Sequence, residues 1–182
     1  MKINTKTGLL AEAKFIASAN CDERPEPCPL ELIVIHNISL PPKEFGGDGI
    51  RQLFCNQLDA NEHPYYAQIA DLKVSAHLLI RRDGEIIQFV PFHKRAWHAG
   101  ISAYHGRDCC NDFSLGIELE GADDIAYEAV QYQQLATIID ELQKVYPSLQ
   151  KDALCGHCDI APARKTDPGK AFDWAYLHTL LK

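Results

Sequence analysis

The strongest local pattern in the sequence is a predicted hairpin over "VSAHLLIRRDGEIIQFVP", residues 74–91. Two runs rich in strand-forming residues flank Asp83-Gly84, a pair that favours a two-residue type I′ turn. A hairpin of this kind requires an antiparallel strand pair, so at least part of the fold must be a β-sheet.

Two further segments predict strands of different kinds. "ELIVIHNISLPP" contains the continuous apolar run Leu32–Ile35, which is typical of a strand buried on both faces and is stopped by Pro41-Pro42. "FSLGIELEG" alternates instead. One face has the apolar residues Leu115, Ile117 and Leu119. The opposite face has Ser114, Gly116, Glu118 and Glu120. A strand face with two glutamates must point toward water or toward a site.

Four segments have helical spacing. One is the N-terminal segment, where an amphipathic helix is expected from Leu9, Leu10, Ala13, Phe15 and Ile16. The second follows Asp48, a plausible N-cap. The third lies within residues 126–149 and ends before Pro147. The last begins after Asp173, which is the expected N-cap. Strands and helices in this order predict a mixed α/β (α+β) protein, with residues 1–182 as a single domain.

The charge balance excludes two classes of partner. The formal net charge is −7, and no run is rich in lysine or arginine. Nucleic acid and anionic membrane surfaces both need a basic face, so neither is expected to bind. Glu12 and Lys14 interrupt the only segment near the N-terminus that resembles a lipoprotein signal. We therefore expect a cytoplasmic protein with a small substrate.

The motif Cys155-Gly-His-Cys158 admits three interpretations. A redox dithiol is disfavoured, because the short remainder of the chain cannot complete a thioredoxin-like fold. A structural zinc site would need a second cysteine pair, from Cys109-Cys110 or from Cys21 and Cys28, and neither has a usual spacing. The seven cysteines are an odd number without a secretion signal, which indicates reduced thiols.

The third interpretation separates His157 from the cysteines and joins it to Asp167. A hydrolytic zinc site needs three nitrogen or oxygen ligands and an open position. His36 is placed to be the third ligand, since it lies where the predicted buried strand ends. From spacing alone, His36 and His157 could equally be ordinary structural histidines rather than metal ligands. Four other histidines are interpreted as structural or surface residues: His63, His93, His105 and His178.

Four segments together resemble the zinc-dependent N-acetylmuramoyl-L-alanine amidases of type 2, which are related to phage amidases and peptidoglycan recognition proteins. They are "IVIHNISLPPKEFGG", "VSAHLLIRRDGEIIQFVPFHKRAWHAG", "CNDFSLGIELEG" and "GHCDIAPARKTDPG". The resemblance covers roughly residues 8–178. It implies a central mixed β-sheet flanked by helices, the fold of peptidoglycan recognition proteins and type-2 amidases.

The function that the resemblance implies is hydrolysis of the amide between (1,6-anhydro-)N-acetylmuramic acid and L-alanine in muropeptides. The chain is similar to the cytoplasmic family members of Gram-negative bacteria, which act in cell-wall recycling and thereby limit β-lactamase induction. A monomer with a muropeptide substrate is expected. The alternative is a non-catalytic module that binds peptidoglycan fragments, because some relatives have lost a metal ligand.

The resemblance also implies the site residues. It places one zinc ion (Zn²⁺) per chain on His36, His157 and Asp167, with Glu118 and Lys165 as catalytic residues. Glu118 can take a proton from water and return it to the leaving amine. Lys165 is two residues before Asp167, so its ammonium can face the forming oxyanion. Glu120 shares the strand face and is the rival base, and His98 is a candidate to support a metal ligand.

Substrate contacts are expected from Asn37, which follows a ligand, and from Trp97 in "WHAG" beside the cleft. Arginines in similar sequences occupy the positions of Lys73 and Cys109, where they would grip the acidic stem peptide. Lys73 keeps the charge but not the two-pronged geometry, and Cys109 keeps neither. Arg107 is the nearby residue that could substitute.

Overall fold

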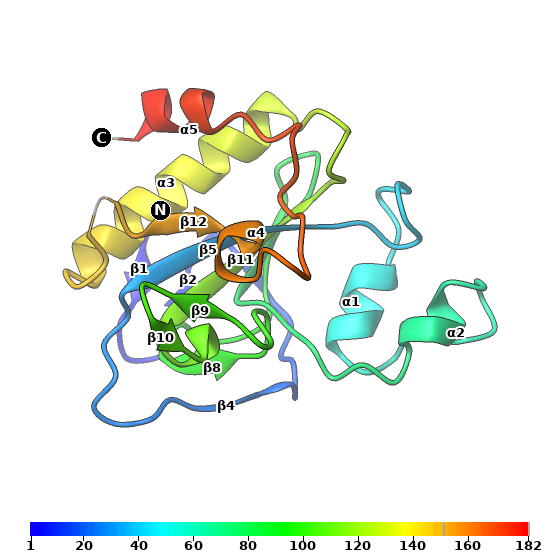
Figure 1. Ribbon diagram of the computed structural model, residues 1–182, viewed down its shortest axis with the longest axis horizontal. Helices are drawn as coiled ribbons and strands as arrows, with labels where there is room; N and C mark the ends of the chain where they lie inside the picture. The colour runs from blue at the N-terminus through cyan, green and yellow to red at the C-terminus, as the bar shows by residue number, and fades with distance from the viewer. Residues whose placement is uncertain (151, 182) are drawn as a thin grey trace.

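A six-stranded mixed β-sheet forms the centre of the computed structural model, which describes residues 1–150 and 152–181 (Figure 1). Its strands, in order across the sheet, are β12 (Leu154–Gly156), β5 (Leu32–Ile38), β11 (Ser114–Glu120), β6 (Leu78–Ile80), β7 (Ile86–Gln88) and β3 (Lys14–Phe15). Only β6 and β7 pair antiparallel within this sheet; the other neighbours are parallel. The mixed α/β class is confirmed.

Shorter strand pairs and helices surround this sheet. The pairs are β1 (Ile3–Asn4) with β2 (Leu9–Leu10), β4 (Cys21–Glu23) with β8 (Lys94–Ala96), and β9 (Ala103–Tyr104) with β10 (Arg107–Asp108). The helices are α1 (Gly49–Phe54), α2 (Tyr66–Ile69), α3 (Ala129–Val145), α4 (His157–Ile160), α5 (Trp174–Leu180) and the 3-10 turn η1 (Cys110–Asp112). In Figure 1, α3 and α5 lie together, while α1 and α2 lie at the opposite end of the molecule. No helix among the described residues is long and apolar enough to cross a membrane.

The apolar run in β5 is buried on both faces, as predicted. Ile33 and Ile35 pack in the cluster that contains α3 and α5. Leu32 and Val34 pack in a second cluster on the other face, with residues of η1 and α4. Since β5 has neighbours on both edges and side chains on both faces, the strand is fully enclosed.

The predicted hairpin over residues 74–91 is present as β6 and β7, but its turn is not type I′. The Gly84 amide donates to the Arg81 carbonyl at 2.9 Å, and Gly84 alone in this turn has a positive φ, at 88°. A type I′ turn needs positive φ at both central residues, whereas a left-handed glycine after an ordinary turn gives a three-residue loop. The Asp83 carboxylate accepts from the Glu85 amide at 3.0 Å, which satisfies that amide inside the loop.

The helix expected from Leu9 to Ile16 is wrong, because this segment contains the short strands β2 and β3 with a turn between them. The side chain of Gln88 on β7 explains the extended conformation. Its oxygen accepts from the Leu10 amide at 2.7 Å, and its nitrogen donates to the Gly8 carbonyl at 2.9 Å. The Ile16 amide donates to the Gln88 carbonyl at 2.9 Å. These backbone groups therefore find partners on β7 rather than within a helix.

The other three helices are where the sequence predicts them. Within α3, Leu135, Ile138, Ile139 and Leu142 are fully buried. Asp173 caps α5 by accepting from the Tyr176 amide at 2.8 Å. Asp48 precedes α1 but makes no side-chain cap, because its carboxylate pairs with Arg51 instead.

Replacing Gln88 by leucine should destabilise the fold strongly. The change keeps a similar volume but leaves the Leu10 amide without its partner. It also removes one donor to the Gly8 carbonyl, which still accepts from the Phe92 amide, and one donor to the Val90 carbonyl. A buried amide without a partner costs about 1–3 kcal/mol, so we expect a loss of about 1–3 kcal/mol in the free energy of unfolding, measured by urea denaturation. The exposed Gln133 on α3 is the control, and Gln133→Leu should change stability by less than about 0.5 kcal/mol. Equal effects of the two changes would contradict this account.

Candidate active site

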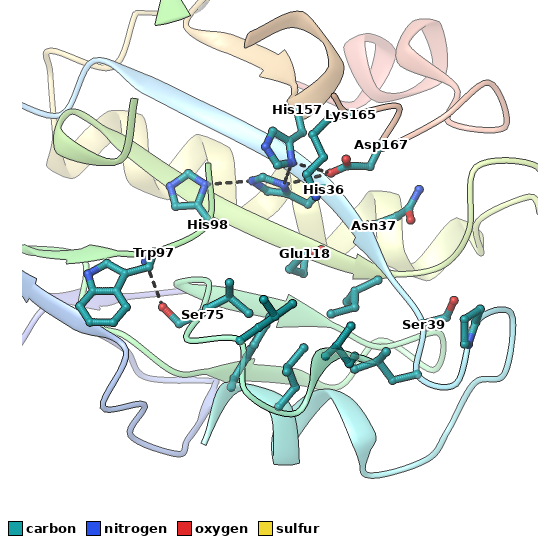
Figure 2. A pocket seen from close by; sticks show the side chains of 18 of the residues that line it. His36, Asn37, Ser39, Ser75, Trp97, His98, Glu118, His157, Lys165 and Asp167 are labelled. Carbon is teal, nitrogen blue, oxygen red and sulfur yellow. Dashed lines mark hydrogen bonds and ion pairs between the residues drawn. The ribbon is translucent and has the colours of Figure 1, made fainter. Parts of the chain in front are cut away.

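Three potential metal ligands meet at one edge of the central sheet. His36 lies near the carboxyl end of β5, and His157 follows directly after the neighbouring strand β12 as the first residue of α4. Because β5 and β12 are parallel, with Ile35 opposite Gly156, their carboxyl ends lie side by side. Asp167 comes from the turn after α4. Figure 2 shows the three side chains pointing toward one another.

The geometry of these three side chains is compact. The Nδ1 atoms of His36 and His157 are 2.9 Å apart, and the Oδ2 atom of Asp167 lies 3.0 Å from the first and 3.1 Å from the second. Ligands at about 2.0–2.1 Å from a tetrahedral zinc ion lie about 3.4 Å from one another. The three atoms are therefore slightly closer together than a bound ion would hold them, and they need only a small outward shift.

The protonation states also suit a cation. Burial lowers the pKa of His36 to about 4, although the nearby Asp167 carboxylate opposes this shift, so the ring is neutral at pH 7. Burial alone would raise the pKa of Asp167, but its close contacts with the two histidines outweigh burial and hold this pKa below its usual range. Imidazole nitrogen and carboxylate oxygen are donors that zinc prefers. The residues present therefore fit a zinc ion.

His157 has a clearly assigned orientation. Its Nε2 atom lies 3.1 Å from the carbonyl oxygen of Ala99, which can only accept a hydrogen bond. Nε2 therefore has the ring proton, and Nδ1 keeps a free lone pair directed at His36 and Asp167. Arg164 donates to the same carbonyl at 2.7 Å, which holds the Ala99 segment against α4 and the turn after it.

The turn that contains Asp167 is fixed by two donors to the carbonyl of Pro168. The Asn37 amide donates to it at 3.0 Å and the Tyr127 hydroxyl at 2.7 Å. Asn37 also donates to Asp123 at 2.8 Å. Both amide hydrogens of Asn37 are thus used inside the protein, and its predicted contact with substrate would have to be through its oxygen.

Glu118 lies beside His36, since the two are register partners on β11 and β5. It is 8% exposed and lines the cavity. Its Oε2 atom is buried and has no hydrogen-bond partner among the residues that the structure describes. Burial, and then the negative charge of Asp167, raise the pKa of Glu118 well above its usual value, while Lys165 opposes the shift.

Glu120, the rival base, is occupied by structural contacts. Its carboxylate accepts from the Gly46 amide at 2.7 Å and the Arg82 amide at 3.2 Å, and it pairs with Arg81 at 3.4 Å. It is 2% exposed and does not line the cavity. These contacts favour Glu118 over Glu120 as the residue available to a substrate.

The cavity itself is a cleft of about 330 Å³ beside the three potential ligands (Figure 2). One wall is apolar and includes Leu53 and Phe54 of α1 and Ile69 of α2. Lys165 lies on the polar side, together with Asp167. Within residues 1–150 and 152–181 its ammonium makes no ion pair or hydrogen bond, so it remains available to an anion in the cleft.

The predicted substrate contacts fall into two groups. Asn37 and Trp97 line the cleft. Lys73 is exposed between two lining residues, Leu72 and Val74, but is not itself part of the lining. Arg107 lies outside the lining of the cleft. It pairs with Glu31 at 2.6 Å and stacks over the ring of Phe113. The structure thus places two of the four at the cleft, and the binding roles stay predictions.

The cysteines are separate from this site. All seven are free, and no cysteine belongs to a cluster of potential metal ligands among the described residues. Burial raises the pKa of Cys155 far above its usual value and also raises that of Cys158, which disfavours a reactive thiolate. The motif that is most conspicuous in the sequence therefore contributes only His157 to the site.

Sequence reasoning did not identify several residues that support the site. The Ala99 carbonyl orients His157, and the Tyr127 hydroxyl holds the Asp167 turn. A backbone carbonyl leaves no signal in the side-chain sequence, and a single tyrosine in a loop is indistinguishable from a core residue. His77, fully buried next to His98, was also not singled out.

Comparison with known proteins gives a consistent result. The sequence profile of the N-acetylmuramoyl-L-alanine amidases matches residues 26–170. The 1,6-anhydro-N-acetylmuramyl-L-alanine amidase AmpD of Citrobacter freundii is 58% identical over 174 residues, which are 96% of this chain and 92% of the relative.

Solved structures agree with the sequence comparison. The crystal structure of a selenomethionine derivative of AmpD superposes with a TM-score of 0.96 at 56% identity and covers all of both chains. The Escherichia coli amidase AmiD, in complex with the substrate anhydro-N-acetylmuramic acid-L-Ala-D-γ-Glu-L-Lys, superposes with a TM-score of 0.60 at 29% identity. That match covers 87% of this chain and 60% of AmiD. The fold implied by the sequence resemblance is confirmed.

Metal binding should depend on Asp167 and not on the neighbouring thiol. Asp167→Ala removes the only charged ligand of the three, so we expect zinc to be lost during dialysis, as measured by metal analysis of the purified protein. Cys158→Ser is the matched control, because this thiol is adjacent to His157 but outside the cluster. This control should retain about one zinc ion per chain. Loss of zinc on Cys158→Ser would instead assign the metal to the cysteines.

Proposed function

The chain belongs to the N-acetylmuramoyl-L-alanine amidase family, and from this premise we propose that it is a zinc-dependent hydrolase of muropeptides. The bond cleaved joins the lactyl group of (1,6-anhydro-)N-acetylmuramic acid to L-alanine of the stem peptide. The observation that supports this best is the position of Glu118, whose unpartnered buried oxygen lies in a cleft beside three converging ligand atoms.

The setting proposed for this activity is cell-wall recycling in the cytoplasm, with one amidase domain per chain acting as a monomer. The name of the Citrobacter freundii relative specifies the anhydro sugar, which favours anhydromuropeptides as substrates. Removal of anhydromuropeptides would also keep β-lactamase induction low. The size and mixed polarity of the cleft suit a sugar-peptide fragment.

His36, His157 and Asp167 are the proposed holders of one zinc ion. When bound, zinc acts as a Lewis acid that acidifies water and polarises the scissile carbonyl. Two neutral histidines and one carboxylate leave a net positive charge at the site, and the cleft beside them leaves room for substrate and water.

Glu118 is the proposed general base and then the general acid. Its carboxylate takes a proton from the attacking water and passes this proton to the alanine nitrogen as the carbon–nitrogen bond breaks. Burial raises its pKa well above the usual value, and a carboxyl group with a raised pKa holds the transferred proton more readily than an exposed one. Proton transfer by a single residue keeps the cycle balanced, because the leaving amine receives the proton that water gave up.

Lys165 is proposed to stabilise the oxyanion that forms at the former carbonyl oxygen. Its side chain lies on the same side of the cleft as Asp167 (Figure 2). An ammonium placed near the position of developing charge lowers the barrier by stabilising that charge. The absence of an ion-pair partner within the described residues suits this role, since a paired lysine would be neutralised.

The alternative function is a module that binds peptidoglycan fragments without cleaving them. In such a protein one ligand or the base would be absent. Here the three ligand atoms lie within 3.1 Å of one another and Glu118 is beside them. The arrangement therefore favours catalysis over binding alone.

Hydrolysis of an anhydromuropeptide is the direct test of the function. Purified protein should release the free stem peptide, with L-alanine at its new N-terminus, as identified by mass spectrometry. Treatment with a strong chelator should abolish the release, and added zinc should restore it. Intact peptidoglycan is the comparison substrate, and we expect slower cleavage of it. Binding without release of peptide, with zinc present, would support the alternative function instead.

Glu118→Gln should retain zinc but reduce the turnover number by about 10²–10⁴-fold, because the amide cannot accept the proton. The matched control is Glu120→Gln on the same strand face. Since Glu120 is held by Gly46, Arg81 and Arg82, that change should lower the melting temperature while the turnover number stays within about tenfold of the original. A near-normal rate for Glu118→Gln would transfer the role of base to another residue.

A further inference from the structure

We propose that His98 is a positioning residue that fixes which nitrogen of His36 has the proton, and so presents the other nitrogen to the metal. This inference rests on the proposed zinc site, because it concerns the orientation of one of its ligands. His98 lies in the loop after β8 and also lines the cleft.

A continuous series of three contacts connects His36 to a backbone carbonyl. His36 Nε2 lies 2.9 Å from His98 Nδ1, and His98 Nε2 lies 3.2 Å from the Ser114 hydroxyl. That hydroxyl donates to the carbonyl of Cys110 at 2.5 Å. The first of these contacts is drawn in Figure 2.

The direction of every hydrogen bond in this series follows from its last member. The Cys110 carbonyl can only accept, so the single hydroxyl proton of Ser114 points to it. The Ser114 oxygen therefore accepts from His98 Nε2, and the other nitrogen of His98 has no proton. His98 Nδ1 must then accept from His36 Nε2. This leaves His36 Nδ1 with a free lone pair, directed at His157 and Asp167.

The opposite direction is unfavourable. If His98 Nδ1 donated to His36, then His98 Nε2 would have to accept from Ser114. The Ser114 hydroxyl would lose its bond to Cys110, and two oxygen atoms 2.5 Å apart would face each other without a proton between them. A buried acceptor left without a donor destabilises the fold. The fold therefore favours one tautomer of His36.

The fold makes room for the His98 ring at a glycine. A Cβ atom on Gly116 of β11 would lie 2.4 Å from His98 Cγ, so a larger residue there would displace the ring. The backbone of the loop is held by Asn111, whose side-chain oxygen accepts from the His98 amide at 3.1 Å and the Ala99 amide at 2.8 Å. Because the Ala99 carbonyl orients His157, this one loop orients both histidine ligands.

The consequence is measurable as metal affinity. Residues that orient a ligand from behind change the affinity for the metal by about 10–100-fold when they are removed. His98→Leu and His98→Asn form a matched pair, since the two side chains are nearly the same size. Asparagine can place its oxygen where His98 has Nδ1 and accept the His36 proton, whereas leucine cannot.

The experiment is a zinc titration against a chromophoric chelator, with the wild type and both variants. We expect His98→Leu to weaken zinc binding by about 10–100-fold, and His98→Asn to remain within about threefold of the wild type. If leucine binds zinc as tightly as the wild type, or if both variants are weakened equally, the proposal is wrong. Equal weakening would show that His98 only fills space.

A spectroscopic measurement tests the tautomer without disturbing His98. Long-range ¹H–¹⁵N NMR of the metal-free wild type should show His36 protonated at Nε2, and the same tautomer at His98. Ser114→Ala removes the hydroxyl that receives the His98 proton, so the His36 signal should move toward a mixture of tautomers. A wild-type His36 protonated at Nδ1 would overturn the proposal.

These readouts are independent of the amidase assay. A protein that binds zinc as expected but leaves muropeptides intact would contradict the proposed function and leave the role of His98 standing. A protein that hydrolyses muropeptides while both His98 variants keep full zinc affinity would contradict only the role of His98.

Discussion

The parallel pairing of β5 with β11 on one edge and with β12 on the other is the constraint on which the site depends. His36 is opposite Glu118 in the register of β5 and β11, and Ile35 is opposite Gly156 in that of β5 and β12. A slip of one residue would place Ile117 or Leu119 beside His36 and turn Glu118 to the other face. The apolar residues that enclose β5 on both faces prevent such a slip, so the core packing fixes the spacing of His36 and Glu118.

Loops around this edge of the sheet hold the side chains of the site in position through hydrogen bonds. The Ala99 carbonyl in the loop after β8 lies against His157, and Asn37 of β5 donates to the turn that contains Asp167. Buried polar groups of this kind are costly if they lose their partners. The contacts that hold the site in shape therefore also contribute to the stability of the fold, and the cleft needs little rearrangement to accept a metal ion.

How much of this could be predicted from the sequence depends on the range of the interactions. Periodicity identified β5, β11, α3 and α5, because burial on one or both faces is a local pattern. The N-terminal segment was mistaken for a helix, since its apolar spacing does not reveal the side chain of Gln88 that binds its backbone from 78 residues away. Glu118 and Glu120 were indistinguishable by alternation. Only the contacts of Glu120 with Gly46, Arg81 and Arg82 separate them.

The proposed ligand set follows only from the resemblance of four segments to a family, because His36 and Asp167 are far apart in sequence and no spacing rule joins them. The central claim is that zinc is bound by nitrogen and oxygen of His36, His157 and Asp167, with the neighbouring cysteines uninvolved. Zinc-edge X-ray absorption of the protein loaded with one equivalent of zinc tests it most directly. The account predicts nitrogen and oxygen neighbours at about 2.0–2.1 Å and no sulfur. A sulfur shell at about 2.3 Å would contradict it and place the metal on the cysteines.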